Sequence, residues 1–228
     1  MAKPPARRST SGDIAQFLQK SRDITEFVER QPRLIFAIDA TASRQPTWDR
    51  ASHLQQSMFR ASGKINSLAV QLCYYRGFGE LQASRWLTDS DALARLMGTV
   101  QCEGGHTQIA RLLRHALQEH NRMPVQALAF IGDALEENPD TLCELAGQCG
   151  LLKLPLFLFQ EGHDSAVEQC LQSMARLSGG AWGRFDAHSA EILAGLLGAV
   201  ASYARGGRTA LETLEGDSAK LLLRQLNH

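Results

Sequence analysis

Three short segments of the sequence carry oxygen side chains that could bind one cation. The apolar run RLIFAI is followed by DATAS, which places a carboxylate at Asp39 and hydroxyls at Thr41 and Ser43. The segment GGHT supplies the hydroxyl of Thr107, and the run ALAFIG is followed by the carboxylate of Asp133. Carboxylate and hydroxyl oxygens, with no thiolate or obligatory imidazole, are ligands suited to Mg²⁺ or Mn²⁺. Because only two carboxylates are in reach, such an ion would keep positive character and a position open to an outside carboxylate.

Short apolar runs, each of strand length, alternate with helical patterns along the chain. Runs that are apolar throughout indicate strands buried on both faces, as in a mostly parallel sheet covered by helices. The pattern predicts a doubly wound α/β fold with a six-stranded sheet in the order 3-2-1-4-5-6 and helices on both faces. We expect strands at 34–38, 65–75, 81–87, 125–133, 152–162 and 181–186, and the main helices within 46–63, 89–100, 101–120, 138–150, 164–180, 189–207 and 217–228.

The third predicted strand, 81–87, follows the turn RGFGE and carries charged and serine side chains. These features are typical of an antiparallel strand at the edge of a sheet. In the predicted order the first and fourth strands are neighbours, at the point where the winding reverses. Ligands of such sheets bind beyond the carboxyl ends of the strands at this point. We therefore expect Asp39 and Asp133 to lie close together, with Thr41, Ser43 and Thr107 beside them.

In combination, DATAS, GGHTQI and FIGD resemble the metal ion-dependent adhesion site of von Willebrand factor type A (vWA) domains. That family has Asp-x-Ser-x-Ser after the first strand, a Thr before a later helix, and an Asp after the fourth strand. The five matching residues occur in the family order. Thr41 replaces the usual Ser, which keeps the hydroxyl but stiffens the side chain at χ1.

The resemblance implies a bacterial-type intracellular vWA domain that acts as a protein–protein interaction module rather than an enzyme. A partner's Asp or Glu would complete the shell of a Mg²⁺ or Mn²⁺ ion, in a multiprotein complex with an ATPase or chaperone partner. His106, Glu136 and Glu137 flank the motifs and are expected at the rim that meets the partner. For the two glutamates a charged helix N-terminus, favoured by the helix dipole, is the alternative interpretation.

A second class, the phosphohydrolases of haloacid dehalogenase type, also has an Asp after its first strand and a later Gly-Asp. There Asp39 would be the nucleophile and Asp133 would hold magnesium. The sequence offers no Lys ahead of Gly-Asp in HNRMPVQALAFIGD, and Thr41 stands where that family has a second acid. Neither Ser43 nor GGHT has a role in this interpretation. A metal-free interaction scaffold is a third alternative.

Composition argues against several classes of partner and binding site. Lys+Arg and Asp+Glu both count 24 in 228 residues, so no net charge favours nucleic acid or an anionic membrane. The five cysteines form no CxxC pair, which argues against zinc and a disulfide framework and fits the cytoplasm. We expect a disordered basic leader at 1–12, a helical segment at 13–31, the vWA-like domain at 33–205 and a helical extension at 206–228.

Overall fold

The structure is a computed structural model, and it describes residues 16–19, 28, 30–44, 68–185 and 190–226. The chain divides into two compact units, Met1–Gln31 and Pro32–His228. The described parts of the first unit include helical residues 16–19. The second unit contains the sheet and all the residues discussed below. The helix predicted at 46–63 lies outside the described residues. The whole of the predicted leader at 1–12 and most of the predicted helical segment at 13–31 also lie outside them.

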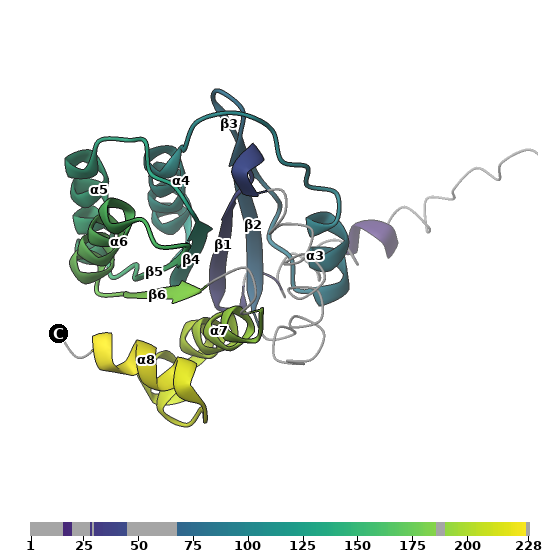
Figure 1. The fold of residues 1–228 in the computed structure, drawn as a ribbon. Helices are drawn as coiled ribbons and strands as arrows, with labels where there is room; N and C mark the ends of the chain where they lie inside the picture. Colours follow the sequence, from purple (N-terminus) through teal and green to yellow (C-terminus); the bar gives the residue numbers. More distant parts are fainter. Residues whose placement is uncertain (1–15, 20–27, 29, 45–67, 186–189, 227–228) are drawn as a thin grey trace, which may run out of the picture. The chain divides into compact units, whose positions relative to one another are not determined.

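The second unit is built on a six-stranded sheet in the order β3-β2-β1-β4-β5-β6 (Figure 1). All neighbouring strands run parallel except β3, which pairs antiparallel with β2 at one edge. The predicted fold class, strand order and antiparallel edge strand are therefore confirmed. The strands are β1 (Arg33–Asp39), β2 (Ala69–Arg76), β3 (Glu80–Ala83), β4 (Ala127–Gly132), β5 (Leu156–Glu161) and β6 (Ala181–Phe185).

Helices cover both faces of this sheet, as the apolar strands require. One buried cluster joins a face of the sheet to α4, α5 and α6, and a second cluster joins the other face to α3, α7 and α8. The helices are η1 (Ala42–Arg44, a 3-10 turn), α3 (Ser90–Met97), α4 (Ile109–Arg122), α5 (Pro139–Leu151), α6 (Ser165–Ser178), α7 (Ala190–Glu212) and α8 (Asp217–Gln225).

Side chains of β1 alternate between these two clusters. Ile35 and Ala37 pack towards α4, α5 and α6, whereas Phe36 and Ile38 pack on the opposite side. Since successive side chains of a strand point to opposite faces, Asp39 falls on the α4 side. The strand therefore delivers this carboxyl group to the edge of the core nearest the start of α4.

The last two helices form the side of the unit next to β6. Regular geometry in α7 is interrupted at Gly206 and Gly207, where Gly207 has φ 63° and ψ −156°, a conformation open to glycine. From α8, the Gln225 side chain pairs with the backbone of Trp182 in the edge strand β6. Its Oε1 accepts the Trp182 N–H at 2.8 Å and its Nε2 donates to the Trp182 carbonyl at 2.7 Å. The α8 helix is thus attached to the edge of the sheet.

Candidate metal centre

Strand register places the two candidate carboxylates at adjacent strand ends. Asp39 pairs with Tyr75 across β1 and β2, and Ile38 pairs with Ile131 across β1 and β4. Asp39 therefore lies level with Gly132, one residue before Asp133. The Asp39 residue has 0% exposure, so its carboxyl group is held inside the protein.

Two hydrogen bonds hold the Asp39 carboxyl group. The Thr41 N–H donates to Oδ1 at 2.8 Å, and the Tyr75 hydroxyl donates to Oδ2 at 3.1 Å. Burial raises the pKa of Asp39 above its usual range, the hydrogen bonds from Thr41 and Tyr75 oppose that rise, and the charge of Asp133 adds to it. Burial and a like charge make this carboxyl group costly to ionise, and a nearby cation would stabilise its ionised form.

The turn after β1 brings the two DATAS hydroxyls together. Thr41 is buried, Ser43 is exposed in η1, and their side-chain oxygens lie 3.2 Å apart. The backbone of Thr41 also forms an isolated bridge with Glu103, whose N–H donates to the carbonyl of Ala40 at 3.0 Å. The hydroxyl pair is therefore attached to the loop that leads to Thr107.

Thr107 and Glu136 bind one another reciprocally. The Thr107 N–H donates to Glu136 Oε2 at 3.0 Å, and the Glu136 N–H donates to Thr107 Oγ1 at 3.0 Å. The first bond, together with one to His106, lowers the pKa of Glu136. The loop after β4 and the loop before α4 are consequently joined around the Thr107 hydroxyl.

Glu137 caps the start of α4. Its carboxylate accepts the N–H groups of Ile109 and Ala110, the latter at 2.9 Å, although burial raises the pKa of Glu137. Since α4 has no side-chain cap of its own at Gln108, the acid from the neighbouring loop takes that place. Glu136 stays half exposed, with His106 Nδ1 at 3.0 Å from its Oε2, so both residues lie at the surface beside the site.

The surroundings of the Asp133 carboxylate indicate whether a cation could bind at this site. Its Oδ1 is buried and has no hydrogen-bond partner within the part of the chain that the structure describes. An orphaned buried carboxylate oxygen is costly, and a bound cation is one way to satisfy it. No group of three or more His, Cys, Asp or Glu side chains with metal-binding geometry occurs among the described residues. The unpartnered oxygen of Asp133, together with the carboxyl group of Asp39 and the hydroxyls of Thr41 and Ser43, fits a hard cation held by mixed carboxylate and hydroxyl oxygens.

Two residues near the site were not predicted from the sequence. Tyr75 reaches Asp39 from the next strand, and its pairing with Asp39 in the β1–β2 register is the signal that could have revealed it. Phe78, at the tip of the turn between β2 and β3, is 85% exposed, and its ring centre lies 5.2 Å from that of His106. The turn is fixed, because Gly77 O accepts the His106 N–H at 3.2 Å. An apolar side chain thus stands in solvent beside the candidate metal residues.

Comparison with solved structures places the fold among vWA-like domains. The chain is similar to the vWA domain of SpRpn10, with 13% identity, a TM-score of 0.52, and coverage of 68% of this chain and 88% of that one. It is also similar to the PilB minor pilin from Streptococcus sanguinis (11% identity, TM-score 0.55, 78% of this chain) and to proximal thread matrix protein 1 from the mussel byssus (14%, 0.56, 76%). The matches span 62% and 47% of those two chains.

At the level of sequence, no family model and no curated protein matches the chain. The likeness to solved structures therefore identifies a vWA-like fold alone.

None of the described helices is both long and apolar enough to cross a membrane.

Proposed function

We propose that this protein is a divalent-cation-dependent protein–protein interaction module. Asp39, Thr41, Ser43, Thr107 and Asp133 would hold Mg²⁺ or Mn²⁺, directly or through water. The ion would leave a position for an Asp or Glu carboxylate of a protein partner. The proposed setting is a cytoplasmic multiprotein complex in which the chain acts as an adaptor, with an ATPase or chaperone among the partners.

The observation that carries this proposal is the buried, unpartnered Oδ1 of Asp133 next to the buried Asp39 carboxyl group. The charge of Asp133 adds to the cost of ionising the buried Asp39 at the end of the adjacent strand, and positive charge between the two side chains would offset that cost. The paired hydroxyls of Thr41 and Ser43 are further oxygen ligands from the same strand end. When bound, the cation would supply electrostatic attraction for a carboxylate.

The protein's own groups determine how that carboxylate would be received. Tyr75 and the Thr41 N–H fix the orientation of Asp39, and Glu136 fixes Thr107. His106 and Glu136 would line the rim, together with the ring of Phe78 and the exposed ion pair of Glu103 with Arg76. A partner that combines a carboxylate for the ion with an apolar neighbour for the exposed Phe78 ring would match this surface.

The metal is tested first, by calorimetric titration of Mg²⁺ and Mn²⁺ into protein freed of metal with a chelator. We expect one binding site, lost in the Asp39→Ala, Ser43→Ala double variant. The matched control is Asp164→Ala, which removes the cap of α6 at the same end of the sheet but outside the site. Equal binding by the double variant and the parent protein would refute the site.

The partner is tested by affinity capture from the native cell extract, with magnesium in one arm and chelator in the other. We expect a specific set of proteins to be retained in magnesium only, and the Asp39→Ala, Ser43→Ala variant to retain none of that set. A set that is identical in both arms would instead support the metal-free scaffold.

The phosphohydrolase alternative has its own assay. On our proposal, the purified protein in magnesium does not hydrolyse phosphoesters such as p-nitrophenyl phosphate. Hydrolysis abolished by Asp39→Asn would decide for the enzyme.

A further inference from the structure

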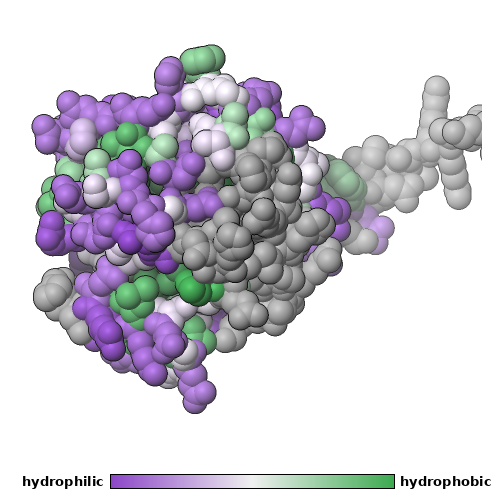
Figure 2. Space-filling model, viewed as in Figure 1, coloured by the Kyte–Doolittle hydropathy of each residue, from purple (hydrophilic) through white to green (hydrophobic). Residues whose placement is uncertain are grey.

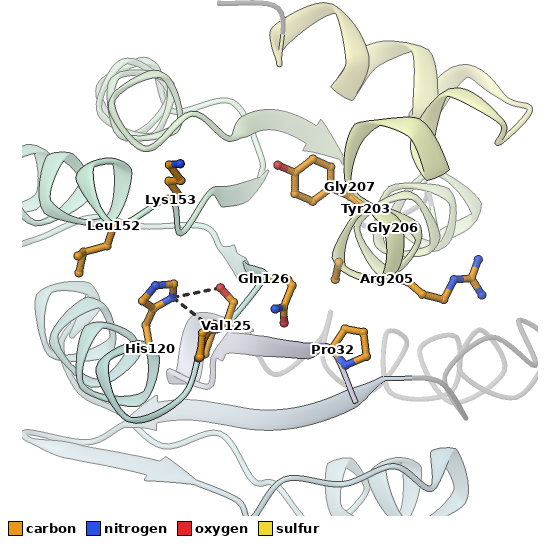
Figure 3. Close-up of a pocket in the computed structure, with 12 residues that line it drawn as sticks. Pro32, His120, Val125, Gln126, Leu152, Lys153, Tyr203, Arg205, Gly206 and Gly207 are labelled. Atoms are coloured by element: carbon orange, nitrogen blue, oxygen red, sulfur yellow. Dashed lines mark hydrogen bonds between the residues drawn. The ribbon is translucent and has the colours of Figure 1, made fainter. Parts of the chain in front are cut away.

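A pocket lies at the opposite end of the sheet from the candidate metal centre. It has a volume of about 570 Å³ and lies where β1, β4 and β5 begin, between the ends of α4 and α5 and the interrupted part of α7 (Figure 3). Its size is within the range of small-molecule sites. The lining residues are Pro32, His120, Pro124, Val125, Gln126, Leu152, Lys153, Tyr203, Ala204, Arg205, Gly206 and Gly207.

The lining is rich in hydrogen-bond donors and contains three basic residues but no acidic residue. Gln126 uses its Oε1 to accept the N–H of Arg33, which leaves the amide Nε2 as a donor. His120 Nδ1 lies 3.2 Å from the backbone nitrogen and 3.1 Å from the carbonyl oxygen of Val125, and it accepts from the first or donates to the second according to its tautomer. Figure 3 shows the Tyr203 hydroxyl directed into the space that Lys153 borders. Prolines, Val125, Leu152 and Ala204 supply an apolar wall.

Lys153 is held in an unusual backbone conformation. Its φ is 59°, and within the described ranges it is the one non-glycine residue with positive φ. The helix α5 ends there in a Schellman motif, since the Lys153 N–H donates to Gly150 O at 3.0 Å and the Leu154 N–H to Cys149 O at 2.9 Å. The left-handed position of this motif strongly favours glycine.

The helix α6 provides a comparison within the same chain. It ends in the same motif, with Gly179 at φ 70° in the left-handed position and Gly180 donating to Ala175 O at 2.8 Å. At α5 the chain carries a lysine in the position where α6 carries the expected glycine. A cation that only complements the helix dipole could stand anywhere in the last turn. The strained position of Lys153 is explained if its ammonium group is needed at this pocket.

From these observations we infer that the pocket binds a small organic anion, a phosphate or carboxylate attached to an apolar body. Lys153 is the charged ligand of the anion, Tyr203 and Gln126 donate hydrogen bonds to its oxygens, and the apolar wall covers the rest. No acidic partner of Lys153 occurs among the described residues, so the ammonium group is available to a ligand. The site lies at the opposite end of the parallel strands from Asp39 and Asp133, and its occupancy does not require the metal.

The experiment titrates phenyl phosphate into the full-length chain and monitors the backbone amide signals by NMR. Inorganic phosphate, which lacks the ring, and phenol, which lacks the phosphate, are the comparison compounds. We expect phenyl phosphate to shift signals of residues 120–126, 152–154 and 203–207. It should bind about tenfold more tightly than either comparison compound, because phenol lacks the charge-assisted contact and inorganic phosphate lacks the apolar ring that the wall would cover. Shifts confined to other regions, or equal binding of all three compounds, would overturn the inference.

Lys153→Gly separates ligand binding from folding, because glycine suits the left-handed position. This variant is expected to lose about tenfold in affinity for phenyl phosphate without a fall in melting temperature. Tyr203→Phe keeps the ring contact with Phe157, whose centre lies 5.1 Å away, and should weaken binding severalfold. The control Lys220→Gln removes one exposed positive charge in α8 and should leave affinity unchanged. Unchanged affinity in Lys153→Gly, or an equal loss in the control, would contradict the assignment.

Discussion

The hydroxyl of Tyr75 donates a hydrogen bond to Oδ2 of Asp39 across 3.1 Å, from the facing position of the neighbouring strand. The Tyr75 ring is fully buried and stacks on Phe130, with 6.2 Å between ring centres. Gly132 leaves room for that stack, because a Cβ there would stand 2.6 Å from Phe130 Cζ. The candidate metal-binding acid is therefore positioned by the packing of the core behind it.

Tyr75→Phe tests this arrangement. The substitution keeps the ring and removes the donor, so we expect a loss of about 1–3 kcal/mol in the free energy of unfolding of the metal-free protein, measured in urea. Calorimetric titration should also show weaker Mg²⁺ binding. Tyr74→Phe is the matched control, because Tyr74 points to the opposite side of β2, and its stability should be unchanged. A Tyr75→Phe protein with the parent's stability and metal affinity would exclude a positioning role.

The stability of the metal-free protein should depend on the ionisation of Asp39. Its folded-state pKa is raised by burial, so the folded state holds the proton more tightly than the unfolded state. That contribution is present below the ordinary carboxyl pKa and is lost as the pH rises through the raised value. We expect thermal unfolding in chelator to show this fall with rising pH, and Mg²⁺ to reverse it above the raised pKa.

Asp39→Asn is the control for the pH dependence, since it cannot ionise. The fall should become shallower in this variant, with a remaining part from Glu137, whose pKa is also raised by burial. An identical slope in parent and variant would mean that Asp39 does not titrate in this way.

Glu137→Ala should destabilise the protein through the start of α4. The carboxylate accepts two backbone N–H groups that have no other side-chain cap, and caps of this kind contribute about 1–2 kcal/mol. The free energy of unfolding in urea is the measurement. Glu144→Ala, at an exposed position of α5, serves as the comparison and should change it by less than about 0.5 kcal/mol. Equal effects would rule out the cap.

Phe78→Ser should separate partner binding from folding and from metal binding. Because the ring is exposed, we expect a change in unfolding free energy within about 0.5 kcal/mol. Mg²⁺ affinity should match the parent protein, while magnesium-dependent capture of the partner should weaken. Full capture by this variant would show that the partner does not contact the turn between β2 and β3.

The thiols should react in two groups with a thiol reagent at pH 8. Burial raises the pKa of Cys149 and Cys170 to about 12 and also raises that of Cys73, so these three remain protonated and shielded. Cys102 and Cys143 are partly exposed and should react first. Mass spectrometry of the native protein should find label on these two, and all five labelled in urea. Early labelling of Cys73 would contradict the described packing.

Much of the fold could be predicted because a few consecutive residues are enough to indicate a buried strand or a helix. Apolar runs such as LIFAI and ALAFI identify buried strands, and an acid at the end of each fixes where the core stops. Strand order followed from the rules for doubly wound sheets. Element ends were less accurate. The second strand was predicted from residue 65, whereas β2 begins at Ala69. The glycine pair that was expected to end the helix at 189–207 does interrupt the helical geometry, and a second helical segment then follows within α7 to Glu212.

The contacts around the candidate site depend on tertiary register, which local patterns do not contain. The bond from Tyr75 to Asp39 joins residues 36 positions apart, and it needs the pairing of β1 with β2. Likewise, Glu137 was expected at the rim or at the start of its own helix, but its carboxylate caps α4, because the loop after β4 packs against that helix. The metal, the partner and the rim roles remain predictions.

The attachment of Gln225 to Trp182 has a consequence for how this protein behaves among copies of itself. An edge strand with unpaired backbone groups is a template on which another chain can add a strand. At β6 a single side-chain amide provides both the donor and the acceptor that one residue of a seventh strand would provide. At Trp182 the edge of the sheet is therefore already paired by a helix that belongs to the same chain. Removal of α8 would leave the backbone N–H and carbonyl of Trp182 unpaired and open to pairing with a strand of another copy.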